Sequence, residues 1–494
     1  MSQDPSVAPP GARTPEDALV VTPPPGPARP SPLAWARARG ERADLREELR
    51  RLLALAVPLV VSHLATIGMS TVDTLMVGPL GAGPLAGLAI GGAIHSATLM
   101  VSMGLLLGMS PLVSQAHGAG RPREPRRVLV QGLWLALALS VPMVALSLAG
   151  EPLALALGQA PAVSARAGEY LTGVAAGIPP VLIFMALRGY VEGLGTTRPS
   201  MVFLLLGFAV NVPANALLVY GALDLFPALG VAGAGWATSL VRWVMLAAMA
   251  AWLLRHPELH PFHGVRLVFR VRRVARILRL GVPISAQMAL EVGLFAFAAI
   301  MMGWFGPLPL AAHQVTINLA ATTFMVALGT ALAGTIRVGF HVGGRRPEGV
   351  HRTVVATYTL AVGFMALCAL AFLLAPRFLL GLYTQDPEIL ALGSRLLFIA
   401  ALFQVFDGAQ VAGICLLRGA GDTRIPMMMA GLGYWAVGLP TAYGLAFHTG
   451  LGPAGVWVGL SAGLAVVAVL MGLRVRRMLW RGEMLRPRAR QVRA

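Results

Sequence analysis

The sequence has few charged residues and no lysine at all. Only 12% of its 494 residues are charged, whereas a soluble globular protein has about 25%. Because 56% of the residues are hydrophobic, the composition excludes an ordinary soluble domain and indicates a membrane protein. The two cysteines, Cys368 and Cys415, lie in apolar runs without metal-ligand spacing, so we interpret both as packing residues.

Motifs for nucleotide hydrolysis and for metal-dependent catalysis are absent. The sequence contains no Gly-x-x-x-x-Gly-Lys phosphate-binding loop, so ATP is not expected to be the direct energy source. It contains no His-Glu-x-x-His and no Cys-x-x-Cys motif, and its histidines do not cluster. We therefore predict that the protein is not an enzyme and that it carries no cofactor.

Long apolar runs dominate the chain. Each is long enough to cross a bilayer as a helix, and none has the short alternating pattern of a β-barrel strand. The sequence therefore predicts an all-α integral membrane protein with twelve transmembrane helices, at approximately 52–78, 84–114, 128–149, 168–189, 200–221, 231–254, 276–304, 310–336, 353–375, 391–416, 425–447 and 453–473.

The positive charge follows these runs in strict alternation. The net charge is +18, and all 39 basic residues are arginines. Five alternate loops hold 19 arginines, the six remaining loops hold three, and each terminal tail holds eight. By the positive-inside rule, the arginine-rich loops and both termini are cytoplasmic, in the inner (plasma) membrane. This pattern accounts for the charge without a nucleic-acid partner.

A repeat divides the chain into two similar halves. The turn at Gly193, Gly195, Thr197 and Arg198 recurs at Gly419, Gly421, Thr423 and Arg424, and Val57-Pro58 recurs at Val282-Pro283. An offset of six helices preserves orientation, so we predict two parallel six-helix lobes around a central cleft. The predicted boundaries are a mostly disordered cytoplasmic tail at 1–51, an N-terminal lobe at 52–254, a basic linker at 255–275, a C-terminal lobe at 276–475 and a basic tail at 476–494.

Two short charged segments lie before the first lobe and between the lobes. Residues 41–51 are expected to form a charged surface helix, in which acids pair with arginines three or four residues away. In the linker, Arg266, Arg270 and Arg273 recur at helical spacing among apolar residues. This pattern suits either a basic amphipathic helix on the anionic inner leaflet or an ordinary positive-inside loop.

Three carboxylates lie deep within apolar runs: Asp73, Glu291 and Asp407. An acid at the centre of a membrane costs a few kcal/mol or more, so such acids commonly serve a function. Each could take a proton, hold Na⁺ or face a cationic substrate, and these three uses exclude one another. We predict that all three couple a cation to transport, with Glu291 and Asp407 as the ligands if that cation is Na⁺. The alternative is a structural acid paired with an arginine or an amide.

Polar residues at helical spacing accompany these acids. Asn211 and Asn215 share one helical face and could line a polar cavity with Asp73, or could bond between helices. Gln287 lies four residues before Glu291, and Gln404 lies three before Asp407. We place Asp73 and these four polar residues in a substrate cavity. Arg242 lies within the sixth run, where it could snorkel to the interface or pair with an acid.

Several motifs together resemble the multidrug and toxic compound extrusion (MATE) transporters, especially the NorM-type bacterial branch. The resemblance covers roughly residues 50–475. It implies export of organic, usually cationic, amphipathic compounds in exchange for Na⁺ or H⁺, with the cation-site acids at Glu291, Asp407 and Asp73. The matching segments are VDTLMVG at 72–78, YVEGLGTTRPSM at 190–201, NVPAN at 211–215, LEVGLFAF at 290–297, AAHQVTIN at 311–318, FDGAQ at 406–410 and LRGAGDTRIPM at 417–427.

The sequence departs from this family in two places. A Tyr that helps to hold the cation in some relatives is replaced by Phe403, which we also place in the cavity; its loss removes one oxygen ligand for Na⁺. Asn215 stands where some archaeal-type relatives have an Asp, which argues against a proton site built wholly in the N-terminal lobe.

We therefore predict a secondary active, monomeric multidrug exporter whose partners are small organic cations and the lipid bilayer. The alternatives are a lipid-linked oligosaccharide flippase of the same superfamily, or a membrane-embedded enzyme. The deep charges are mainly acidic, which favours the exporter over the flippase. The sequence does not distinguish Na⁺ from H⁺ as the coupling ion.

Overall fold

The computed structural model describes residues 39–221 and 227–485, and these residues form helices and turns without any β-strand. The chain divides into two units, Met1–Leu45 and Arg46–Ala494, and the architecture described below is that of the second. The predicted disordered tail falls mainly on residues 1–38, which lie outside the described part, as do residues 486–494 of the basic C-terminal tail.

Most helices of both lobes begin where the sequence changes from a glycine turn or a polar segment to an apolar run, and several have proline in the first turn. Proline is favoured there because its missing N–H would have no intrahelical partner. The N-terminal lobe contains α1 (Arg39–Val77), η2 (Gly78–Leu80), α2 (Ala82–Leu107), α3 (Met109–Gly118), α4 (Arg123–Leu148), α5 (Gly150–Ala156), α6 (Pro161–Ala175), α7 (Ile178–Gly193), α8 (Arg198–Tyr220) and α9 (Val231–Arg255).

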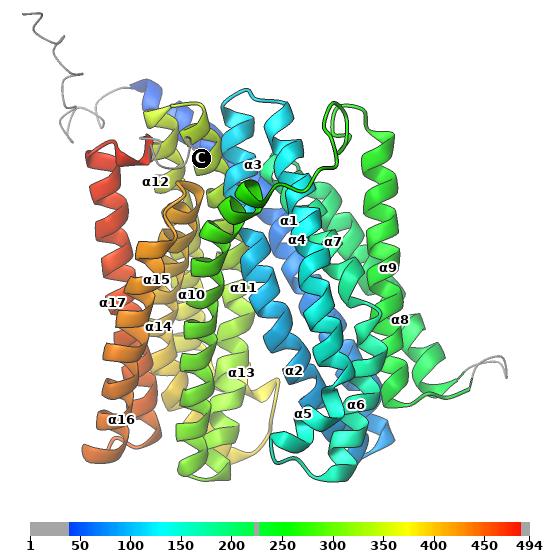
Figure 1. The fold of residues 1–494 in the computed structure, drawn as a ribbon. Helices are drawn as coiled ribbons and strands as arrows, with labels where there is room; N and C mark the ends of the chain where they lie inside the picture. Colours follow the sequence, from blue (N-terminus) through cyan, green and yellow to red (C-terminus); the bar gives the residue numbers. More distant parts are fainter. Residues whose placement is uncertain (1–38, 222–226, 486–494) are drawn as a thin grey trace, which may run out of the picture. The chain divides into compact units, whose positions relative to one another are not determined.

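The C-terminal lobe repeats this order (Figure 1). Each lobe encloses its own apolar core. The helices of the C-terminal lobe are α10 (Val271–Trp304), α11 (Pro307–Gly343), α12 (Pro347–Leu374), α13 (Pro376–Gly381), α14 (Pro387–Gly419), α15 (Arg424–Gly431), the π-helical segment η3 (Leu432–Gly438), α16 (Leu439–His448) and α17 (Pro453–Trp480), followed by the short η4 (Glu483–Leu485).

The predicted twelve membrane segments in two lobes are confirmed. Within the described residues, ten helical segments are long and apolar enough to cross a membrane by themselves, and α6 with α7 makes an eleventh that is bent by 50°. The remaining segment consists of α15, η3 and α16 in succession. It is divided into three short elements because the π-helical turn interrupts its α-helical hydrogen bonds.

The backbone repeats as the sequence does. Gly195 and Gly421 occupy equivalent turns with φ of 85° and 81°, and Gly230 and Gly452 have φ of 58° and 56°. The short helices α5 and α13 also occupy equivalent places, each before a proline-started long helix. The N-terminal and C-terminal lobes are therefore copies of one six-segment unit.

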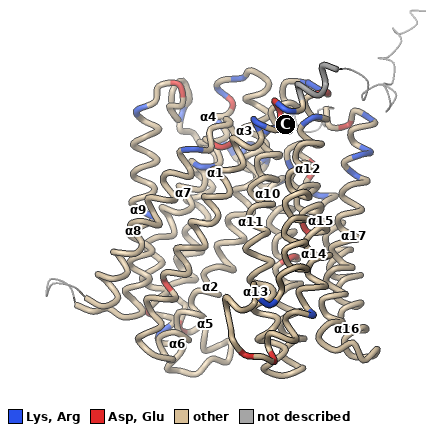
Figure 2. Tube along the Cα trace, turned by 180° about the vertical axis from the view of Figure 1, so that it is seen from behind, with Lys and Arg blue, Asp and Glu red and all other residues tan. Residues whose placement is uncertain are grey.

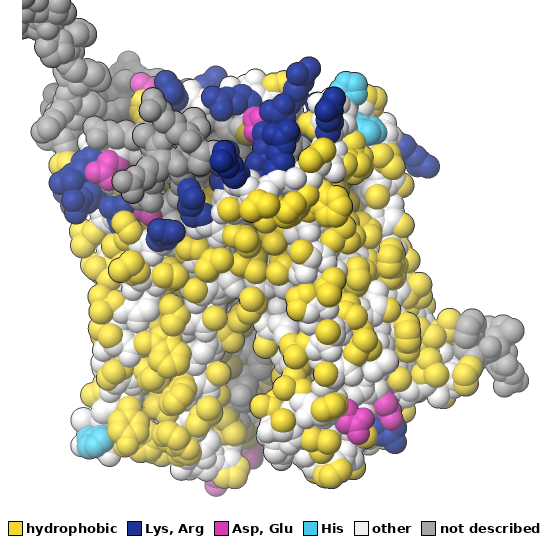
Figure 3. Space-filling view, in the orientation of Figure 1, with side chains coloured by type: hydrophobic (Ala, Val, Ile, Leu, Met, Phe, Trp, Pro, Cys, Tyr) yellow, Lys and Arg dark blue, Asp and Glu magenta, His cyan; other side chains and the backbone are white. Residues whose placement is uncertain are grey.

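Arginines concentrate at one end of the bundle, the arginine-rich end (Figure 2). There the lobes are in close contact through glycines of α2 and α3 on one side and α10 and α11 on the other. A Cβ atom on Gly118 would lie 1.9 Å from the carbonyl oxygen of Phe340, and one on Gly343 would lie 2.0 Å from that of Gln115. Toward the opposite end, the space-filling view shows a hollow between the lobes (Figure 3).

The linker and the segment before the first span differ from the predictions in their helix bounds. α1 begins at Arg39, so residues 39–51 continue directly into the first membrane helix. Of the two alternatives for the linker, the loop is observed: residues 261–270 form turns and irregular chain, and no helix runs through Arg266 and Arg270, because α10 begins at Val271. At the other end, α17 continues to Trp480, beyond the predicted end of the lobe.

Glu48 of α1 connects the two lobes at the arginine-rich end. It is 5% exposed and accepts hydrogen bonds from Arg337 of α11 (Nε to Oε1, 2.9 Å) and from the hydroxyl of Thr353 of α12 (2.6 Å). His341 Nε2 lies 3.7 Å from the same carboxylate. The expected local pairing holds for the neighbouring Glu47, which bonds Arg51 at 2.9 Å, but Glu48 pairs with the opposite lobe instead.

The substitution Glu48→Gln should destabilise the protein, because it leaves the largely buried Arg337 guanidinium without its counterion. We expect the free energy of unfolding to fall by about 3 kcal/mol, measured by thermal or chemical denaturation in detergent. The matched control is Glu47→Gln, which breaks an exposed pair worth less than about 1 kcal/mol. Equal effects of the two substitutions would show that Glu48 does not hold the lobes together.

Candidate functional site

In the C-terminal lobe, the predicted acids Glu291 and Asp407 share one hydrogen-bond donor. Glu291 lies on α10 and Asp407 on α14, and the side chain of Gln410 lies between them. Its Nε2 donates to Asp407 Oδ1 at 3.1 Å and to Glu291 Oε1 at 3.3 Å. Asp407 is buried, with 4% of its surface exposed, and Glu291 is partly exposed. The structure therefore brings together two acids that are more than a hundred residues apart in the sequence.

Tyr434 fixes the orientation of this amide. The tyrosine lies on the π-helical segment η3 and is fully buried, and its hydroxyl donates to Gln410 Oε1. The amide oxygen is thereby used, and the amide nitrogen is directed to the two acids. A chain of hydrogen bonds thus runs from η3 through α14 to α10.

Sequence reasoning did not assign a role to Gln410 or Tyr434. Gln410 could have been found, because it lies three residues after Asp407 and so on the same helical face. Tyr434 gave no comparable signal, since its position depends on the packing of a π-helical turn. Phe403, the position where some relatives have a tyrosine, carries no hydroxyl, whereas Tyr434 brings one to the same network from another segment.

The predicted cavity residue Gln287 lies beside Glu291, as expected, and also has a partner on α14. It lies one turn before Glu291 on α10 and is 3% exposed. Its Oε1 accepts a hydrogen bond of 2.7 Å from Arg418 Nη2 of α14. Arg418 also lies within electrostatic range of Glu291, so its guanidinium is the nearest described cation to the acid pair.

Phe403 and Gln404 are buried inside the C-terminal lobe. Phe403 is 1% exposed, and its ring packs against Phe295 and Trp457 with centroid distances of 6.1 and 5.6 Å. Gln404 donates to the hydroxyl of Thr323 on α11. Both residues therefore pack within their own lobe.

In the N-terminal lobe, Asp73 and the two predicted asparagines form one cluster. Asp73 Oδ1 accepts from Asn211 at 3.0 Å and from Asn215 at 2.7 Å. Its other oxygen accepts from Thr238 of α9 at 3.1 Å, a residue that the sequence did not single out. The carboxylate thereby links α1, α8 and α9.

Arg242 is directed into the same lobe and does not snorkel to the interface. It is 9% exposed, and its Nη2 lies 2.8 Å from His95 Nε2 of α2. It is within electrostatic range of Asp73 and Tyr170. The acid of the N-terminal lobe therefore has a buried arginine nearby, as Glu291 has Arg418.

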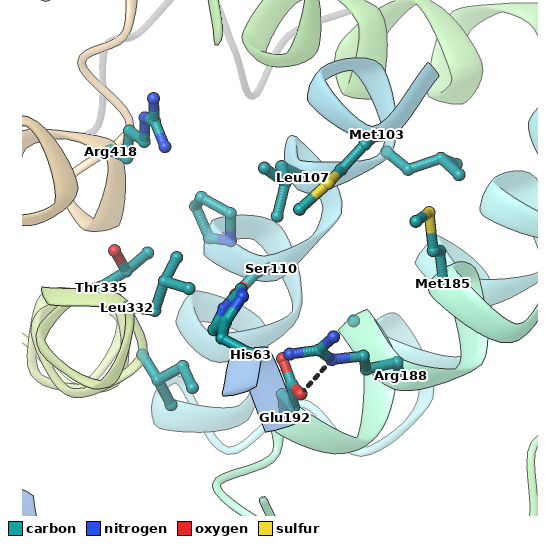
Figure 4. Close-up of a pocket in the computed structure, with 14 residues that line it drawn as sticks. His63, Met103, Leu107, Ser110, Met185, Arg188, Glu192, Leu332, Thr335 and Arg418 are labelled. Atoms are coloured by element: carbon teal, nitrogen blue, oxygen red, sulfur yellow. Dashed lines mark hydrogen bonds and ion pairs between the residues drawn. The ribbon is translucent and has the colours of Figure 1, made fainter. Parts of the chain in front are cut away.

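A cavity lies between the lobes in the arginine-rich half. Arg418 projects into it from one side, and the hydrogen-bonded pair Arg188 and Glu192 lies on the other (Figure 4). The rest of the lining is mainly apolar and includes Met103 and Met185. Flexible methionine side chains can adapt to molecules of different shape, so the cavity suits an amphipathic guest.

No group of three or more His, Cys, Asp or Glu side chains within residues 39–221 and 227–485 could hold a metal ion. A Na⁺ ion would therefore need oxygens other than carboxylates. The site offers the carboxylates of Glu291 and Asp407, the amide of Gln410 and the hydroxyl of Tyr434. These groups could equally share a proton.

Comparison with known proteins gives a consistent result. The MatE family model matches residues 58–217 and 283–444, so one match falls on each lobe. The chain is 39% identical over 448 residues to the probable multidrug resistance protein NorM of Mesorhizobium japonicum, covering 88% of this chain and 95% of that protein. It is 36% identical to the multidrug resistance protein MdtK of Edwardsiella ictaluri, covering 87% and 95%.

Solved structures share the fold. The eukaryotic MATE transporter AtDTX14 superimposes with a TM-score of 0.80 at 20% identity, covering 91% of this chain and 100% of that one. The Vibrio cholerae MATE transporter VcmN in its bent form gives 0.80 at 19% identity, covering 90% and 99%. With a family match on each lobe and relatives of 36 to 39% identity along most of its length, this chain belongs to the MatE family of membrane transporters.

Proposed function

We propose that the protein is a secondary active multidrug exporter, which exchanges Na⁺ or H⁺ for organic, cationic and amphipathic compounds. The observation that carries the proposal is the pair Glu291 and Asp407, held by one amide donor deep in a membrane bundle. The named function of the NorM and MdtK relatives supports the drug-export part. The adaptable cavity between the lobes supports a broad substrate range.

The arrangement of the lobes supports alternating access. By the positive-inside rule the arginine-rich end faces the cytoplasm of a cell with an inner membrane, and both chain ends lie on that side. The lobes are closed there and hollow at the opposite end (Figure 3). We assign this arrangement to an outward-facing state of a monomer, in which a coupling ion can enter from outside.

Ion binding at the acid pair would change the Gln410 network. A cation between Glu291 and Asp407 repels the amide N–H group that now donates to both acids. The amide would turn its oxygen toward the ion, and its bond with Tyr434 would break. Loss of this bond releases η3 from α14. Ion binding would therefore allow the membrane segment that contains η3 to move.

The exported compound competes with the ion for the same negative charge. An organic cation in the cleft is stabilised by the ionised acids, and a proton or Na⁺ on those acids removes this attraction. Ion entry from outside therefore favours release of the drug. After the lobes turn inward and the ion leaves, the acids can attract the next drug molecule.

The substitution Asp407→Asn should abolish coupled efflux and leave folded yield largely unchanged, because the amide keeps the shape of the side chain but not its charge. Efflux of a fluorescent organic cation from proteoliposomes would be measured under separate Na⁺ and pH gradients. The matched control is Asp386→Asn on the same helix, since asparagine also caps helices. Full efflux by the Asp407 variant would contradict the site assignment.

The substitution Tyr434→Phe should make the coupling ion bind more readily, because Gln410 is no longer held in its ion-free orientation. A hydrogen bond of about 1 kcal/mol corresponds to a roughly fivefold lower ion concentration for half-maximal efflux. Tyr443→Phe, on α16 of the same membrane segment, is the control, since this tyrosine is 48% exposed. A higher half-maximal concentration would instead identify the Tyr434 hydroxyl as an ion ligand.

A further inference from the structure

The linker between the lobes is fixed along α4 by one glutamine. The Nε2 of Gln131 donates to the carbonyl oxygen of Val268 at 2.9 Å, and its Oε1 accepts from the backbone N–H of Arg270 at 2.8 Å. The side chain of Gln131 is buried. The ring of Phe269 packs edge-on against Trp134 of α4 at 6.2 Å. The extended segment 265–270 therefore has a defined position on the N-terminal lobe.

This segment carries large apolar side chains that the protein leaves uncovered. Leu267, Phe269 and Val271 are 57%, 49% and 69% exposed. In the space-filling view, arginines at the arginine-rich end lie directly above a band of hydrophobic side chains (Figure 3). Side chains at such a boundary face the region where lipid headgroups meet acyl chains.

Arginines gather around the same segment with too few acids to neutralise them. Arg273 of α10 lies within electrostatic range of Arg127 and Arg270. Glu124 contacts Arg127 and Arg273, the latter at 3.5 Å. The exposed Arg270 and Arg272 contact no carboxylate within the part of the chain that the structure describes. The group has an excess of positive charge and therefore fits an anion.

We propose that this surface binds an anionic phospholipid of the leaflet on the arginine-rich side. Arg270, Arg272 and Arg273 hold the headgroup phosphate, since guanidinium groups bind phosphate through paired hydrogen bonds. Leu267 and Phe269 contact the acyl chains. A phospholipid fits both halves of this surface, whereas a soluble anion would use only the arginines.

The position of this lipid gives it a role in the transport cycle. Arg127 lies on α4 of the N-terminal lobe, and Arg273 lies on α10, the first helix of the C-terminal lobe. Gln131 of α4 fixes the segment that carries Arg270, whereas Arg272 and Arg273 lie on α10. A phosphate held by these three arginines draws the two lobes together at the end where they are closed. The lipid therefore stabilises the closed arginine-rich end, independently of which drug or ion is transported.

Binding of phosphatidylglycerol to the purified full-length protein would be measured by native mass spectrometry, with phosphatidylcholine as the neutral lipid. We expect the double variant R270Q/R272Q to bind phosphatidylglycerol on the order of 30-fold more weakly than the unmodified protein, or about fivefold for each arginine. The matched control is R345Q/R346Q at the same end. It also removes two exposed arginines near the start of a helix, and it should bind as the unmodified protein does.

A second variant keeps all the arginines and releases the linker. Gln131→Leu should also weaken phosphatidylglycerol binding, because the segment no longer holds its apolar and basic side chains together. Equal phosphatidylglycerol binding by R270Q/R272Q and the unmodified protein would overturn the proposal. Full displacement of the lipid by millimolar inorganic phosphate would also overturn it, by showing a simple anion site.

Discussion

The high cost of placing a carboxylate inside an apolar bundle governs this structure. Each deep acid must have partners, and the two lobes supply them differently. Asp73 has three donors and a nearby arginine, Arg242. Glu291 and Asp407 share the amide of Gln410, and Glu291 also has Gln287 and Arg418 nearby. The fully partnered acid suits a structural or substrate-facing role, and the under-partnered pair suits a site that gains and loses a cation.

The contacts between the lobes complement this site. Glycines allow α3 and α11 to approach closely at the arginine-rich end, and the Glu48 cluster adds charged contacts between α1 and the opposite lobe. Both sets of contacts must break if that end opens during transport. The hydrogen-bond chain from Glu291 to Tyr434 crosses three segments of the C-terminal lobe alone. In the proposed mechanism, the ion therefore acts on the C-terminal lobe alone, and the contacts between the lobes change as a consequence.

The architecture and the deep acids could be predicted from the sequence because both depend on local pattern. Apolar run length predicts the membrane segments, arginine alternation predicts their direction, and an acid within such a run is conspicuous. The shared face of Asn211 and Asn215 followed from helical spacing, whereas their bonds to Asp73 on another helix did not. Partners supplied by distant segments could not be predicted: Tyr434 on a π-helical turn, His95 beside Arg242, and Arg337 beside Glu48. The helical spacing of the linker arginines also suggested a helix that does not form, because Gln131 hydrogen-bonds the backbone of segment 265–270.

The central claim is that ion binding at Glu291 and Asp407 drives the movement of the lobes. It is tested most directly by the distance between spin labels at Leu157 and Leu382, which are exposed at the arginine-poor ends of the two lobes, in a protein without Cys368 and Cys415. Adding the coupling ion should shift this distance distribution in the otherwise unmodified protein and leave it unchanged in Asp407→Asn. An equal shift in both proteins would contradict the account, because the lobes would then respond to the ion without the acid pair.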